Sequence, residues 1–175
     1  MTQYSKSMVI VHWLTLALLA AAWFLGEALS DATDENSATI AGYLVHLLVG
    51  GSVLLLTAAR LYFRVKHGTP APLGDSAMDK VAKGIHHMLY TVLFLLPVSG
   101  FVTLMSSDAA RALSSGDASL LPKEGGYDEI FAHDVHEILV NILIVLVAVH
   151  VLGALKHQFV LKDGIMERMM LRRKP

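Results

Sequence analysis

Cysteine is absent from the 175 residues of this chain. Its absence excludes disulfide bonds, thiolate zinc sites, iron–sulfur clusters held by cysteine, and haem attached covalently through a C-x-x-C-H motif. Any metal in this protein must therefore be bound by histidine or by a carboxylate. Histidine, in contrast, is abundant, with nine residues.

Charged residues are also scarce, at 17% of the chain. Few of them fall within four apolar runs, which we expect to form helices over about 8–29, 39–63, 81–105 and 133–161. Each run approaches or exceeds the roughly 20 residues that cross a hydrocarbon core of about 30 Å. No alternation of period two runs through them, which disfavours a β-barrel. The sequence predicts an all-α membrane protein, a four-transmembrane-helix bundle that forms a single domain over residues 1–175.

The basic residues are distributed unevenly between the two sides of this predicted bundle. Twelve of the 14 lysines and arginines fall in the N-terminus, the connection between the second and third runs with its flanks, and the C-terminal tail. Only Arg111 and Lys123 belong to the other side, where eleven acidic residues lie. Because positive charge favours the cytoplasmic side, both termini are predicted to be cytoplasmic. The net charge of −1 gives no indication of nucleic-acid binding.

The last apolar run carries two histidines on one helical face. His136 and His150 are 14 residues apart, which on a helix is about 21 Å along the axis. An ionisable side chain at membrane depth is costly and indicates function by default. The predicted orientation places His12 and His150 near the cytoplasmic edge, and His46 near the outer edge together with His136.

Each layer therefore offers one imidazole from the last helix and one from another helix. Two facing imidazoles are what a six-coordinate b-type haem needs as axial ligands. Glycines near these histidines, Gly42, Gly50 and Gly153, could let a flat ring approach the backbone. Plain helix packing through small residues, and hydrogen bonding between helices by single histidines, remain open alternatives. A histidine-lined transporter for a transition metal is a third.

Further residues on the cytoplasmic side are candidates for secondary roles. His86 and His157 could bond a haem propionate or deliver protons to a quinone headgroup. Arg60 and Arg64 could pair with propionates, or could simply anchor the second helix at the membrane surface. His67 and His133 are expected to be bystanders.

Ordered motifs along nearly the whole chain resemble those of the bacterial cytochrome b561 family. They are Y-S-x-x-x-x-x-x-H-W from Tyr4, the segment around His46, R-L-x-x-R from Arg60, H-x-x-L-Y-x-x-x-x-x-x-P-x-x-G from His86, H-E at His136, H-V-L-G-A-L-K-H from His150, and K-D at Lys162. The resemblance implies a four-helix inner-membrane protein with two b haems.

The resemblance also implies which residues serve these cofactors. It assigns His12 with His150, and His46 with His136, as axial ligands, and it argues against His86 as a ligand. It further implies ubiquinone as electron partner near the inner haem, with His157 a candidate contact.

One activity within the family oxidises periplasmic superoxide and reduces ubiquinone, so such an oxidoreductase is one expectation. The acidic outer side would repel an anionic substrate, which favours a periplasmic donor protein instead. An electron shuttle or membrane anchor for a periplasmic redox partner, without a substrate of its own, is therefore the alternative. No catalytic residue is assigned.

Overall fold

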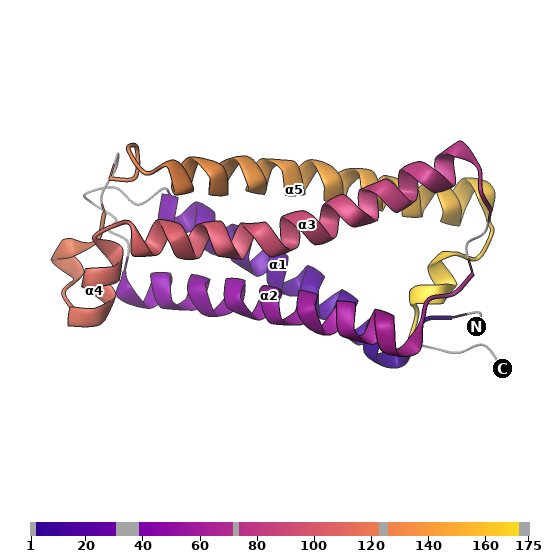
Figure 1. Cartoon of the computed structure of the whole chain (residues 1–175), viewed down its shortest axis with the longest axis horizontal. Coiled ribbons are helices and arrows are strands. Elements are labelled where there is room, and N and C mark those ends of the chain that lie inside the picture. Colours follow the sequence, from indigo (N-terminus) through magenta and orange to yellow (C-terminus); the bar gives the residue numbers. More distant parts are fainter. Residues whose placement is uncertain (1–2, 31–38, 72–73, 123–125, 172–175) are drawn as a thin grey trace.

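Four long helices lie side by side in the computed structural model, which describes residues 3–30, 39–71, 74–122 and 126–171 (Figure 1). They are α1 (Lys6–Ser30), α2 (Ile40–His67), α3 (Ala77–Met105) and α5 (Phe131–Lys156). All four are long and apolar enough to cross a membrane. Within the described ranges there is no strand. The predicted all-α, four-helix membrane fold is confirmed.

The helices are arranged as two closely packed pairs. The first pair is α1 with α2 and the second is α3 with α5, while α2 and α3 join the pairs. A small core of Val53, Val92, Leu93, Leu143 and Leu146 lies between the pairs. Most other large apolar side chains are exposed, as expected for a bundle whose outer surface faces lipid.

Two helix ends extend beyond the bounds predicted from hydropathy. The third helix begins at Ala77 rather than at residue 81, because Ser76 and Asp79 form a capping box that satisfies its first N–H groups. The second helix continues past residue 63 to His67 and ends at Gly68, whose φ of 70° only glycine adopts readily. Hydropathy identifies the lipid-spanning part, whereas polar caps determine where a helix ends.

Both described ends of the chain lie at the same end of the bundle, here called the terminal end (Figure 1). The Tyr4 N–H donates to the Arg168 carbonyl at 3.2 Å, and the Trp13 indole N–H donates to the Met169 carbonyl at 3.0 Å. The short helix η3 (Met166–Met169) therefore rests on the start of α1. Arg168 also donates to the Ala71 carbonyl at 2.7 Å, which ties this turn to the connection between α2 and α3.

The opposite end is covered by the short helices α4 (Ala109–Ser115) and η1 (Ala118–Leu120). Ala109 and Ala112 are fully buried and pack in one cluster with Tyr43 and Leu121. The Tyr43 and Tyr127 hydroxyls share a hydrogen bond of 2.7 Å. Burial raises the pKa of Tyr127 above its ordinary value, so its phenol stays protonated at neutral pH.

Tyr127→Phe should lower the free energy of unfolding by about 1 kcal/mol, because the buried Tyr43 hydroxyl loses its partner. Unfolding in mixed micelles, followed by circular dichroism, measures the change. Tyr62→Phe is the matched control, since that ring is exposed on α2 and its contact with Lys66 needs only the ring face. Equal stabilities of the two variants would contradict a role for the tyrosine pair in holding this end together.

Candidate haem-binding site

Two couples of imidazole rings connect the α1–α2 pair to α5. The ring centres of His12 and His150 lie 6.2 Å apart, with an angle of 77° between their planes. Those of His46 and His136 lie 6.4 Å apart at 73°. The first couple lies toward the terminal end and the second toward the opposite end, since 14 residues of α5 separate their α5 members. The structure thus brings together the four histidines in the combinations that the sequence predicts.

The separations within both couples suit a shared metal atom. A metal bonded to one nitrogen of each ring, at about 2 Å per bond, places the ring centres about 6 Å apart. His86 also lies close to His150, but at 5.2 Å between ring centres the two rings are too near to take opposite axial positions on one metal. His86 instead lies edge-on against the side of the His150 couple.

The ring of His136 is held in a tautomer that leaves Nε2 free to bind a metal. Its Nδ1 lies 3.0 Å from the Leu96 carbonyl and 3.0 Å from the Ser99 hydroxyl. A carbonyl only accepts, so Nδ1 carries the proton and donates it to Leu96. Such a backbone contact is typical of metal-binding histidines, because it fixes the ring and raises the basicity of the ligating nitrogen.

The partner ring, His46, is less constrained. Its Nδ1 is buried without a hydrogen bond among the described residues, although the Ala22 carbonyl of α1 is close enough to interact with the ring. A buried polar nitrogen without a partner is costly and needs an explanation. A metal held at Nε2 would leave Nδ1 protonated, with the Ala22 carbonyl as the nearby acceptor.

Glycines allow α1 and α3 to approach the His46–His136 couple closely. A Cβ atom on Gly100 would lie 2.9 Å from Cε1 of His136, and one on Gly26 would lie 3.3 Å from Cε1 of His46. Gly50 and Gly153 face open space instead, which leaves room for a flat ring as the sequence suggested. Gly42 differs from that expectation, because a Cβ there would meet the Leu29 side chain at 3.3 Å.

Arg60 of α2 lies next to the terminal-end couple, His12 and His150. Its guanidinium lies 2.8 Å from Nδ1 of His12 and 5.5 Å from the centre of the Tyr90 ring. Its Nε is buried without a hydrogen bond among the described residues. Arg64 lies one turn further along α2 and is exposed. Arg60 is therefore the arginine that lies beside the couple.

The remaining histidines lie away from the two histidine couples. His157 follows α5 and bonds Asp163 through Nδ1 at 2.5 Å. The His133 ring stacks on Tyr127 at 4.7 Å, and the His67 ring stacks on Phe63 at 5.7 Å. His87 bonds its own helix backbone, at the Lys83 carbonyl. These contacts give His67, His87 and His133 local packing roles.

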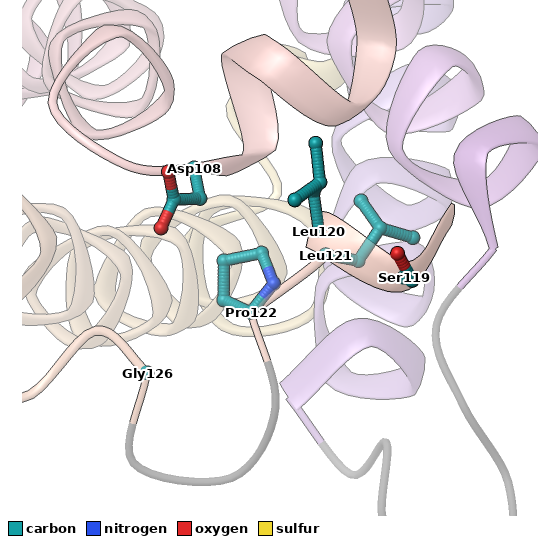
Figure 2. A pocket seen from close by; sticks show the side chains of 6 residues that line it. All are labelled: Asp108, Ser119, Leu120, Leu121, Pro122 and Gly126. Atoms are coloured by element: carbon teal, nitrogen blue, oxygen red, sulfur yellow. The ribbon is translucent and has the colours of Figure 1, made fainter. Parts of the chain in front are cut away.

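A hollow of about 320 Å³ lies elsewhere, beside α4 and η1 (Figure 2). Its described lining consists of Asp108, Ser119, Leu120, Leu121, Pro122 and Gly126. None of the histidines lines it, and the one charged side chain of this described lining, Asp108, is paired with Arg111 at 3.3 Å. This hollow therefore does not belong to the histidine site.

Several residues of the site carry no signal that sequence reasoning used. Three of them contact a histidine of a different helix: Ser99, Gly26 and Gly100. Asp163 contacts His157 because the chain reverses direction after α5. Gly100 ends the motif that begins at His86, and Asp163 belongs to the K-D motif at Lys162; these were the available indications. The others could be identified only from contacts in three dimensions.

Comparison with known proteins agrees with this arrangement. Residues 3–171 match the family model described as prokaryotic cytochrome b561. The chain is 31% identical to the protein named Cytochrome b562 of Cereibacter sphaeroides, over 95% of this chain and 94% of that protein. It is 27% identical to Cytochrome b561 homolog 1 of Escherichia coli K12, over 99% of this chain and all of that protein. It is 25% identical to a Yersinia pestis protein named Probable superoxide oxidase CybB, over 96% of each chain.

The family match covers nearly the whole chain, and the four apolar helices and paired histidines suit a b-type cytochrome of the bacterial inner membrane. The chain therefore belongs to the prokaryotic cytochrome b561 family of multi-pass, b-type membrane cytochromes.

Proposed function

We propose that this protein carries electrons across the inner membrane between a periplasmic donor and membrane quinone, with a haem b at each histidine couple. The observation that carries the proposal is the pair of ring separations, 6.2 Å and 6.4 Å, one couple toward each end of a four-helix bundle. Bound iron would supply one-electron redox chemistry, and two imidazole ligands leave it no open position for oxygen.

The terminal end is proposed to be cytoplasmic. Described basic residues gather there on α2, α3 and the segment after α5, and the positive-inside rule favours that orientation. The three basic residues at positions 172–174 lie outside the described residues. In this orientation His12 and His150 would hold the inner haem, and His46 and His136 the outer one.

Arg60 must change partner when the inner haem binds. A guanidinium only donates, so its contact with Nδ1 of His12 requires that Nε2 carry the ring proton. Ligation of iron through Nε2 requires the opposite tautomer. We propose that Arg60 then turns to a haem propionate, which also satisfies its unpaired Nε. Arg64 would assist as a second cation, and His86 would support the His150 ring from the side.

Quinone is proposed to exchange electrons at the terminal end. His157 lies two turns beyond His150 along the chain, so it is near the proposed inner haem. Its side chain is 28% exposed, so water can also reach it. An imidazole there can move a proton to or from a quinone headgroup as the electrons pass. The identity of the quinone as ubiquinone rests on family membership.

Two donors are consistent with the family. The relative named as a superoxide oxidase supports superoxide. The local charge favours a neutral or basic donor protein, because the exposed Arg111 is already paired with Asp108, while Lys123 lies outside the described residues. An anionic substrate is best collected by unpaired positive charge. Stopped-flow reduction of the protein by superoxide separates the two: a rate no faster than that of an unrelated b cytochrome would rule out the superoxide reaction.

A reduced-minus-oxidised spectrum of the purified protein tests the core of the proposal. We expect an α-band typical of six-coordinate b haem, and a haem content of two per chain. A transporter for transition metals, or a bundle whose histidines only bond neighbouring helices, would show no such band. Binding of carbon monoxide to the reduced protein is the companion measurement, and it should be negligible because both axial positions are occupied.

A further inference from the structure

The chain reverses direction just after α5 through an irregular segment at the terminal end (Figure 1). The helix ends in one π-helical turn, η2 (His157–Leu161), which the Lys162 N–H closes on the His157 carbonyl at 2.8 Å. Lys162 has a left-handed φ of 52° and Gly164 a φ of 73°. A left-handed conformation is unfavourable for lysine, so this geometry is maintained by the contacts it makes.

The reversal returns the Asp163 carboxylate to His157. One carboxylate oxygen lies 2.5 Å from Nδ1 of His157, and the other accepts the Ile165 N–H at 3.1 Å. The hydrogen bond from His157 holds the pKa of Asp163 below its ordinary value, so the carboxylate is ionised at neutral pH. An ionised carboxylate only accepts hydrogen bonds, so Nδ1 of His157 carries a proton. The proton-exchanging atom of this imidazole is therefore Nε2.

The pair is accessible to water. The side chains of His157 and Asp163 are 28% and 26% exposed, so water can reach them. Asp79 of α3 is close enough for its charge to act on His157, but its Oδ2 atom accepts hydrogen bonds from Ser76 in the capping box. Lys156 and Lys162 flank the pair on its own segment. Asp163 is thus the residue that orients this imidazole.

We propose that Asp163 is a positioning residue for proton transfer to quinone: it accepts the Nδ1–H of His157, so that Nε2 is the atom that takes up a proton from water and passes it to the quinone headgroup. This inference rests on the proposed function, which supplies the two electrons. Reduction of a quinone to its quinol takes two electrons and two protons. The Nε2–H bond of protonated His157 breaks as one quinol O–H bond forms, water at the same end returns a proton to Nε2, and water supplies the second quinol proton.

Asp163→Asn is the informative variant, because it keeps the size of the side chain and removes the charge that selects the tautomer. The rate of quinol formation by the chemically reduced holoprotein, mixed with a short-chain ubiquinone in a stopped-flow instrument, should fall by about 10-fold or more. The haem content and the α-band should stay as in the wild type. Asp163→Glu should restore most of the rate. Asp75→Asn should leave it unchanged, since Asp75 is an exposed carboxylate at the same end, near Lys83.

A spectroscopic measurement separates positioning from general support of the fold. In protein labelled with ¹⁵N-histidine, the signal that disappears in His157→Gln should report the Nδ1–H form in the wild type and in Asp163→Glu. It should shift to mixed tautomers in Asp163→Asn. An unchanged tautomer signal, or a rate for Asp163→Asn equal to that for Asp75→Asn, overturns the inference. If the reduced wild-type protein forms no quinol at all, the quinone half of the proposed function fails with it, whereas the haem spectrum tests the other half separately.

Discussion

His150→Ala should abolish the inner haem and leave the outer one, so that the purified protein holds one haem per chain. The reason is that the ring of His150 is the α5 member of the terminal-end couple, 6.2 Å from that of His12. Alanine leaves only one imidazole, that of His12, to bind this haem. The ring of His86 lies to the side of His150 and is not positioned to replace it as a ligand. His136→Ala should give the converse, with loss of the outer haem alone.

Haem content by the pyridine haemochromogen method and redox titration of the α-band measure this result. Each variant should show a single midpoint potential where the wild type shows two. His87→Ala is the matched control, because it removes an imidazole from α3 that bonds only its own helix backbone. Addition of imidazole to His150→Gly should restore the inner haem by filling the vacated position. If His150→Ala or His136→Ala retains two haems, the assignment of couples is wrong.

Gly100→Ala should disturb the outer haem although it changes neither ligand. The added methyl would lie 2.9 Å from Cε1 and 3.1 Å from Nδ1 of His136, closer than side-chain carbons approach one another. The contact involves an imidazole held against the Leu96 carbonyl, so the ring must leave its hydrogen bond or α3 must move outward. Overpacking of this kind costs about 1–3 kcal/mol. We expect reduced occupancy of the outer haem, a shift of its midpoint potential, and an unchanged inner haem.

Two other glycines provide a graded comparison on the same scaffold. Gly26→Ala should have a weaker effect, since its methyl would meet His46 at 3.3 Å. Gly51→Ala should have none, because that position faces open space on the exposed side of α2. Occupancies that decrease in the order Gly51, Gly26, Gly100 would support the steric explanation. Equal occupancies in all three variants would show that close approach of the helices is not required.

Much of this site could be predicted from the sequence because its principal signals are local and periodic. Apolar runs of about 20 residues identify membrane helices without any knowledge of packing. The 14-residue interval between His136 and His150 places both on one face of α5, and charge bias indicates which other histidine shares each layer. These arguments use spacing along one helix and a common depth, both of which a sequence contains directly.

The remaining features depend on contacts between distant segments or on irregular backbone. The hydrogen bond from His136 to Leu96 joins residues 40 positions apart, and that between Tyr43 and Tyr127 joins residues 84 apart. Neither has a periodic signature. Asp163 reaches His157 only because a π-helical turn and a left-handed lysine reverse the chain, whereas a continued α-helix would separate two residues six positions apart. The early start of α3 is different, since Ser76 and Asp79 form a capping motif that hydropathy alone overlooks.

The division of the bundle into two helix pairs has a consequence for biogenesis. Each histidine couple takes one ring from the α1–α2 pair and the other from α5, which is the last long helix to be synthesised. The His46–His136 couple cannot be complete before residue 136 is synthesised, nor the His12–His150 couple before residue 150. On the proposed assignment of one haem to each couple, cofactor loading would therefore follow translation of almost the entire chain. Until then His12 and His46 of the first pair would lack their partner rings.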